Sequence, residues 1–417
     1  HYFQFSLKEK KLEPINYWQP FQNSNYLGLK NENDIIELGS KLILDSFKMQ
    51  MQTDTNLAIN VSSGIDSKLM LNCLNQINNG QGNIVANSFF FDETEYNEKP
   101  DLAKFASSIN WEINFFKITS KDIHENFDKM LEMHDGPFPG VPTIAKSLLI
   151  QRSSKKNYKV ILEGQGGDDI AGGYKYIFGH YLYDLFLAGK FNSVYQEFIK
   201  FSNNENEKYF NVFVSVLKNL FSLNKGGFSA DGSKNKKKNI FNKDLIKNYN
   251  ILNDDIYLDL KKIDKYLKKI IYRDLFYTKL QRILKSCDRA SMMNGKELRV
   301  PLLNHNLVEF FFNLENGCFI KNGHLRYIYR KILHNLNIKS VPFEKKKYVS
   351  DPQVFWLKNN LFDWAYSILG DSKTYHDGIY NTKNLLKEFE KFKKDPSQIN
   401  SNFIWQALCL KRMIQKI

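Results

Sequence analysis

The chain has 417 residues, a formal net charge of +14, 42% apolar residues and 14% aromatic residues. This apolar and aromatic content excludes a disordered chain, and the length suits a large core divided between two domains. No uninterrupted apolar run reaches the ~18 residues that a membrane helix needs, so we expect no membrane partner. The four cysteines form no C-x-x-C pair, which is typical of reduced thiols in a cytoplasmic protein rather than of a disulfide framework or a zinc site.

The positive charge raises the question of a nucleic-acid partner. The sharpest basic run, KNKKK at residues 234–238, lies in a segment rich in Gly, Ser and Asn. Such a segment is typical of a solvated loop, and it offers few aromatic side chains to stack on bases. We therefore expect no nucleic-acid partner.

Helix and strand patterns alternate after an extended entry segment at residues 1–33. Apolar spacing predicts helices over residues 34–52 (with Asp34 as N-cap), 68–77, 100–109, 121–133 and 143–153. Buried-strand patterns fall between these helices, over residues 57–62, 83–91, 113–119 and 159–163. This order predicts an α/β domain over residues 34–180, built on a doubly wound parallel sheet.

The pattern changes in the second half of the chain. Long amphipathic stretches dominate residues 181–417, and strand patterns nearly vanish there. This periodicity predicts a large, mainly helical region packed beside the sheet.

The first motif, NVSSGIDSKLM at residues 60–70, joins the first strand to the next helix. Small residues there let the backbone approach a ligand, and N–H groups at a helix N-terminus face an anion. Ser67 can cap the helix and offer its hydroxyl to a phosphate. Asp66 suits an anion site only if a divalent cation lies between them. A plain strand-to-helix turn remains the alternative for this motif alone.

The second motif, ILEGQGGDDIAGGY at residues 161–174, follows the fourth strand. In an open parallel sheet, both loops emerge at the carboxyl edge, where ligands bind. Asp66 and Asp168 can then share one Mg²⁺ that bridges ATP oxygens. The glycines of the loop keep side chains away and permit unusual backbone angles.

Several segments, in chain order, resemble the synthetase domain of glutamine-dependent asparagine synthetases. SSGIDS resembles the family's S-G-G-x-D-S pyrophosphate loop, and LEGQGGDDIAGGY resembles S-G-E-G-x-D-E-x-x-G-G-Y. The other matching segments are YNEKPDLAKFA at 96–106, HDGPF at 134–138, CDRASMMNGKELRVPLLNHNLVEF at 287–310, LRYIYRKIL at 325–333 and KKKYVSDPQVFWL at 345–357.

The resemblance implies a pyrophosphate-loop ATPase fold, similar to the adenine nucleotide alpha hydrolases, and a two-step reaction. A carboxylate, in asparagine synthetase that of aspartate, attacks the α-phosphorus of ATP and pyrophosphate leaves. Ammonia then displaces AMP and gives the amide. Lys346, placed by counting back from Pro352, would stabilise charge on phosphorus, although Lys345 and Lys347 leave this assignment open by one position.

The resemblance also implies the site residues. The residues implied for ATP and pyrophosphate are Ser62, Ser63, Gly64, Asp66, Ser67, Gly164, Gln165, Gly166 and Gly167. The catalytic residues implied are Lys346, Asp168, Asp66 and Glu98, with Asp66 and Asp168 as the metal ligands. The residues implied for the acceptor substrate are Asp135, Arg289, Arg299 and Arg330.

One departure affects the chemistry directly. Gln165 stands where the family has a glutamate, the suspected base for the incoming amine, and an amide cannot accept a proton at neutral pH. Glu163 or Asp169 can take its place, or neutral ammonia needs no base. Further departures at Gly136 and Leu303–Asn304 put strict aspartate specificity in doubt.

The start of the chain suggests a partner. Its first residues, HYFQFSLKEKKLEPINYWQP, resemble the linker that follows a glutaminase domain in this family, and the chain begins with His1 instead of Met. We hypothesise a fragment or processed product of a longer amidotransferase. A glutaminase domain or subunit would then supply ammonia.

Three other functions remain open at this stage. An amidotransferase of the same family could act on a sugar acid or a peptide carboxylate, which the change at Gln165 favours. A tRNA-modifying enzyme with the same loop is the second, and the GGDD…GGY and RVPLL segments argue against it. A catalytically silent binding protein is the third.

Overall fold

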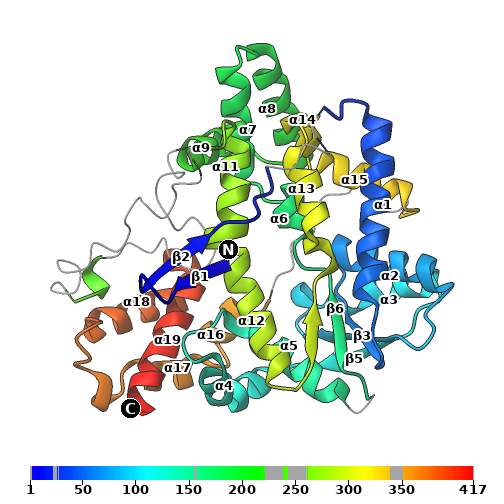
Figure 1. Cartoon of the computed structure of the whole chain (residues 1–417). Coiled ribbons are helices and arrows are strands. Elements are labelled where there is room, and N and C mark those ends of the chain that lie inside the picture. The colour runs from blue at the N-terminus through cyan, green and yellow to red at the C-terminus, as the bar shows by residue number, and fades with distance from the viewer. Residues whose placement is uncertain are drawn as a thin grey trace.

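A computed structural model describes residues 2–21, 26, 28–154, 157–220, 238–242, 260, 262–338 and 351–416. It contains a five-stranded sheet with the order β5-β4-β3-β6-β7, in which every neighbouring pair is parallel. The sheet lies at the lower right in Figure 1, where β3, β5 and β6 are labelled. The strands are β3 (Leu57–Asn60), β4 (Val85–Phe90), β5 (Ile113–Lys117), β6 (Val160–Glu163) and β7 (Glu297–Arg299).

The helices around these strands confirm the doubly wound architecture. α1 (Glu32–Gln50) precedes β3, and the connecting helices are α2 (Ile65–Asn78), α3 (Lys99–Ser108), α4 (Ser120–His134) and α5 (Gly140–Ser153). From β3 the chain adds strands outward on one side, and it then returns to add β6 on the other side. The strand order therefore reverses between β3 and β6, which is the place where open α/β sheets bind ligands.

The two central strands are read easily from sequence because both of their faces are covered. All residues of β3 and β6 are buried, as expected for parallel strands between helical layers.

The expected first helix needs a small correction at its cap. It begins at Glu32, because the side chain of Asn31 accepts the N–H of Asn33 at 2.9 Å, and Asp34 lies in its first turn.

The expectation of almost no strand after residue 181 needs a larger correction. β7 comes from that region and pairs with β6 at the sheet edge. Its three residues, E-L-R, carry only one apolar side chain and give no strand pattern. The guanidinium of Arg299 bonds to the carbonyls of Gln50 and Gln52 at 2.9 and 2.8 Å, which fixes the end of α1 to this strand.

The rest of the described chain confirms the large helical region (Figure 1). Its helices are α6 (Gly167–Ala171), α7 (Ile177–Leu187), α8 (Phe191–Glu205), α9 (Tyr209–Leu220), α11 (Tyr266–Arg273), α12 (Leu280–Met292), α13 (His305–Asn313), α14 (Asn316–Phe319), α15 (Tyr327–Asn335), α16 (Gln353–Lys358), α17 (Phe362–Leu369), α18 (Thr382–Lys394) and α19 (Ser401–Lys416). Two short antiparallel pairs accompany them, β1 (Tyr2–Ser6) with β2 (Lys11–Ile15) and β8 (Ile320–Lys321) with β9 (His324–Leu325). No helix in the described ranges is long and apolar enough to cross a bilayer.

Two large apolar cores hold the layers together. One joins α1, α2, α13 and α15 to the sheet and contains Phe47, Phe310 and Tyr329. The other joins α4 and α5 to the helices α16–α19, drawn in orange and red in Figure 1, and contains Trp356 and Trp405. α5 contacts β4 and β5 of the sheet as well as α19, so it lies between the sheet and this C-terminal helix.

The second core encloses a salt bridge. Lys411 Nζ lies 2.7 Å from Asp377 Oδ2, and both side chains are 0% exposed. The same ammonium donates to the carbonyl of Thr374 at 2.6 Å and to the hydroxyl of Thr382 at 2.8 Å. Removing one partner of such a pair leaves the other charge buried, which is more costly than never having had the pair.

We expect Lys411→Met to lower the free energy of unfolding by about 3–5 kcal/mol, because Asp377 would remain buried without its cation. Lys121→Met is the control, since Lys121 and its partner Glu125 are 81% and 57% exposed and its loss should cost less than about 1 kcal/mol. Urea denaturation measures both values. Equal losses in the two variants would contradict a structural role for the buried pair.

Candidate active site

The loop after β3 is closed by its own serine side chains. The hydroxyl of Ser67 accepts the N–H of Ser62 at 3.0 Å, and the hydroxyl of Ser62 accepts the N–H of Gly64 at 3.3 Å. Ser67 is the third residue of α2. The expectation that Ser67 caps this helix was therefore wrong. The N-cap is Gly64, and no side chain caps the helix there. An uncapped first turn leaves N–H groups for an anion.

Glu98 supports this loop from the next crossover. Its Oε2 atom accepts the N–H of Ser63 at 3.0 Å, and it precedes α3 as the N-cap residue. Its carboxylate therefore fixes the backbone of the loop.

The loop after β6 lies so close to the first loop that a side chain on its glycines would displace Asp66. A Cβ atom on Gly164 would lie 3.0 Å from the backbone carbonyl carbon of Asp66, and one on Gly167 would lie 2.6 Å from Asp66 Oδ1. Gly166, with φ +100, makes the turn between them in a conformation that other residues rarely adopt. These glycines let the Asp66 carboxylate pack against the start of α6.

Asp66 and Asp168 meet at one buried guanidinium group. Arg326 Nη1 lies 2.7 Å from Asp168 Oδ1 and 3.7 Å from Asp66 Oδ1, and its side chain is 2% exposed. The hydroxyl of Tyr329 also donates to Asp66 Oδ1, at 2.7 Å. The two carboxylates of the two loops therefore share one edge of the sheet and one cation.

Arg326 holds an unusual backbone conformation there. Its φ is +57, in the left-handed region that a bulky side chain seldom occupies. Such strain persists where the surrounding contacts over-determine it and is common at functional sites. The sequence resemblance covered this arginine but gave no reason to place it between the two acids.

The acids also limit which ion the site can hold. Among the described residues, no group of three or more His, Cys, Asp and Glu side chains could bind a metal ion. Magnesium is commonly held by one or two carboxylates together with substrate phosphates. Asp66 and Asp168 fit that pattern, whereas they do not form a complete protein cage.

A cavity of about 940 Å³ opens between the two loops, α3 and α5. This volume lies within the range of small-molecule sites. The structure brings most of the predicted site residues to its wall, namely Ser62, Ser63, Gly64, Asp66, Ser67, Gly164, Gln165, Asp168 and Arg330.

Further cations line the same cavity. Lys146 comes from α5, Lys279 immediately precedes α12, and Arg326 precedes α15. Of these, only Arg326 lies in a segment that carried the family resemblance. The ammonium of Lys279 lies 2.8 Å from the ring centroid of Tyr174, which favours a positive charge over the ring face. Packing between distant helices gathers these cations at the loop edge.

Several predicted residues do not line the cavity. Asp135 and Arg289 form an ion pair of 3.0 Å at the surface, with side chains 68% and 41% exposed. Arg299 bonds to α1 and to Glu297. Lys346 lies outside the described residues.

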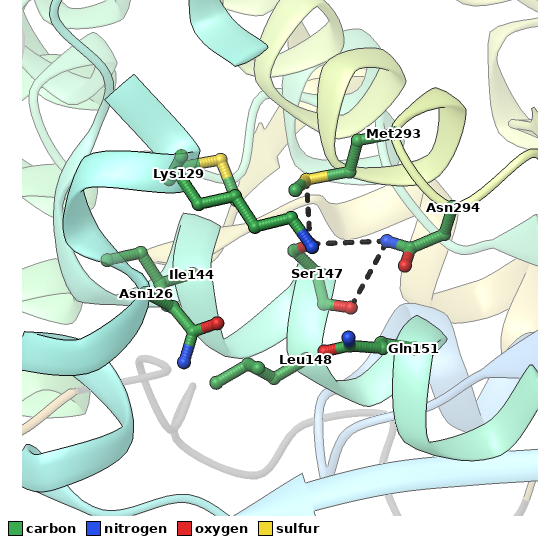
Figure 2. A pocket seen from close by; sticks show the side chains of 9 residues that line it. Asn126, Lys129, Ile144, Ser147, Leu148, Gln151, Met293 and Asn294 are labelled. Atoms are coloured by element: carbon green, nitrogen blue, oxygen red, sulfur yellow. Dashed lines mark hydrogen bonds between the residues drawn. The ribbon is translucent and has the colours of Figure 1, made fainter. Parts of the chain in front are cut away.

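A second, small cavity lies where α4, α5 and the end of α12 meet (Figure 2). Its volume is about 10 Å³, room for about one water molecule. At its wall, Asn294 Nδ2 donates to Ser147 Oγ at 3.2 Å, and Ser147 Oγ donates to Met293 Sδ at 2.9 Å. These bonds attach α12 to α5, and the space is too small for a substrate.

Comparison with known proteins identifies the family. The asparagine synthase family model matches residues 39–415. The chain belongs to this family.

Its relatives include asparagine synthetase [glutamine-hydrolyzing] 1 of Bacillus subtilis, which is 23% identical over 94% of this chain and 61% of the relative. Asparagine synthetase [glutamine-hydrolyzing] 2 of the same organism is 22% identical over 76% of this chain and 39% of its own length. The chain thus spans about three fifths of the first relative. Among solved structures, the NH3-dependent NAD synthetase of Campylobacter jejuni is similar over 35% of this chain and 61% of its own, with 16% identity and a TM-score of 0.24.

The shared guanidinium gives a test of the cation site. We expect Arg326→Met to lower the free energy of unfolding by about 3–5 kcal/mol, because the two acids lose the cation between them. Magnesium ions should then raise the melting temperature of the variant more than that of the wild type, since they can occupy the vacated position between the carboxylates.

Arg412→Met is the matched control, because Arg412 pairs with Asp128 at 2.6 Å outside the cavity. Differential scanning calorimetry with and without magnesium measures all three proteins. A magnesium shift in Arg326→Met no larger than in the other two proteins would show that loss of the guanidinium opens no position for the ion between Asp66 and Asp168.

Proposed function

We propose that the protein is an ATP-dependent amide-forming ligase. It adenylates a carboxylate, with aspartate as the first candidate, releases pyrophosphate and transfers ammonia to give the amide and AMP. The observation that carries this proposal is the meeting of Asp66 and Asp168 at one guanidinium, on the wall of a cavity of about 940 Å³. The family relationship supports the same reaction class.

The cations of the cavity explain why adenylation is favourable there. A carboxylate is a poor electrophile until it is activated, and its attack on phosphorus gathers negative charge on the phosphate oxygens. Lys279, Arg326 and Arg330 line the cavity from the helical side, where fixed cations stabilise that charge without reorganisation. A magnesium ion bound by Asp66 and Asp168 would supply further positive charge to the triphosphate. Lys346 remains a candidate for the same role.

Ammonia is proposed to come from a glutaminase domain or subunit. The relatives named above are glutamine-hydrolysing, and the chain spans 61% of the first of them. The hairpin of β1 and β2 carries exposed apolar side chains, including Phe3 at 68% and Leu7 at 84% exposure. Such a surface is suited to a protein partner.

The four cysteines are unpaired thiols, which suits a reducing, cytoplasmic location.

A second acceptor class deserves a test because of one residue. Gln165 lies on the cavity wall where the family has a glutamate. An altered acceptor site would suit a sugar acid or a peptide carboxylate instead of aspartate. The chemistry at phosphorus would be the same for either acceptor.

We expect pyrophosphate release when ATP, magnesium, ammonium and aspartate are supplied together, and little release without a carboxylate. A coupled pyrophosphate assay with a panel of aspartate, sugar acids and peptide carboxylates measures this dependence. Turnover only with another acid would favour the alternative acceptor. Activation by tRNA, or no turnover with any acid, would contradict the proposed function.

The contact between the loops gives a second expectation. Gly167→Ala places a Cβ atom 2.6 Å from Asp66 Oδ1, so the carboxylate must move. We expect ATP-dependent pyrophosphate release to fall at least ~10-fold, equivalent to about 1.4 kcal/mol of transition-state stabilisation. Gly317→Ala is the control, because a Cβ there meets nothing within 4 Å. Wild-type rates in both variants would contradict the role given to Asp66.

A further inference from the structure

Two polar side chains end the central strands and face the same cavity. Asn60 and Glu163 are the last residues of β3 and β6 and lie opposite each other in the parallel register. Asn60 Nδ2 donates to Glu163 Oε1 at 2.8 Å. Both residues line the cavity although they are almost fully buried.

Lys146 completes this group from α5. Its Nζ atom lies 2.6 Å from Glu163 Oε2 and 3.0 Å from Cys287 Sγ. Burial opposes a charge on Lys146, but its neighbours outweigh that effect and raise its pKa. Burial also raises the pKa of the Cys287 thiol, and the Glu163 carboxylate is the closer of these two partners of Lys146.

One acceptor in this group is left without a donor. Asn60 Oδ1 is buried and has no hydrogen-bond partner within the described part of the chain. An unsatisfied buried acceptor is unfavourable, so a ligand that brings an N–H group there is stabilised. The Glu163 carboxylate offers further acceptor capacity beside it, because each of its oxygens has two lone pairs.

We propose that Asn60 Oδ1 and Glu163 bind the incoming ammonia and that Glu163 accepts its proton. This inference rests on the proposed function and assigns its base. Glu163 thus performs the proton transfer for which Gln165 has no suitable group. Lys146 is a positioning residue that orients the Glu163 carboxylate through the contact of 2.6 Å.

The step balances without another reactant. The nitrogen lone pair attacks the acyl carbon of the adenylate, a C–N bond forms, and the carbonyl π electrons move to oxygen. The nitrogen now carries a positive charge, and its proton passes to Glu163. The carbonyl re-forms, the bond from carbon to the phosphate oxygen breaks, and AMP leaves with the electron pair. Glu163 then releases its proton to water.

Neighbouring groups fit this role less well. Lys146 is protonated and has no free lone pair on its ammonium. Asp169 does not line the cavity and accepts the hydroxyl of Tyr174 at 3.2 Å. Glu163 is the carboxylate that combines a place on the cavity wall with the neighbouring open acceptor of Asn60.

The variant Glu163→Gln separates the two half-reactions. With the acceptor found in the panel above, ATP–pyrophosphate exchange measures adenylation, and amide formation from ammonium measures the second step. We expect exchange to stay within about threefold of wild type and amide formation to fall ~100-fold, the usual size of a general-base effect. Hydroxylamine should restore the second step, because its adduct loses a proton to water far more readily.

Glu388→Gln is the matched control, since Glu388 is a buried glutamate that bonds to Lys391 at 2.8 Å outside the cavity. It should leave both half-reactions unchanged. If thermal unfolding shows that Glu163→Gln does not fold, Glu163→Asp replaces it in the same two assays. This variant keeps a carboxylate beside Lys146 but moves the acceptor oxygens away.

Three results would overturn the assignment. Ammonium-dependent amide formation at the wild-type rate in folded Glu163→Gln protein would show that Glu163 is not the base. If Glu163→Gln loses both ATP–pyrophosphate exchange and amide formation, Glu163 acts in adenylation instead. Wild-type protein that forms no amide from ammonium with any acceptor would overturn the proposed function itself, and with it this inference.

Discussion

The placement of the Arg326 guanidinium between two carboxylates is the interaction on which the site depends. Asp66 and Asp168 come from loops about 100 residues apart in the sequence, and burying both near each other without a cation would be costly. Arg326 lies within 4 Å of both. It is the N-cap residue of α15 and lines the cavity beside both loops, so the helical region and the α/β region together build one cavity.

Much of the fold could be predicted because the central strands have a clear sequence pattern. The residues of β3 and β6 form short, fully buried apolar runs, each followed by a glycine-containing loop. Parallel topology then requires both loops to emerge at one edge, which made the meeting of Asp66 and Asp168 predictable. β7 could not be read, because three residues with one apolar side chain give no pattern until β6 provides a partner.

The site was only partly predictable for a related reason. Lys146, Lys279 and Arg326 lie on separate helical segments, and tertiary packing alone brings them to the cavity. Asp135 and Arg289 illustrate the opposite case, because both lie in segments with a specific family resemblance and yet bond to each other at the surface. The group of Asn60, Glu163 and Lys146 likewise needs the register of β3 and β6 to become visible.

A crystal structure with magnesium and α,β-methylene-ATP tests the central claim most directly, because this analogue cannot release pyrophosphate. We expect one magnesium ion coordinated by Asp66, Asp168 or both, with the triphosphate against the loop at residues 62–67. A nucleotide bound elsewhere, or a metal ion that contacts neither carboxylate, would contradict it.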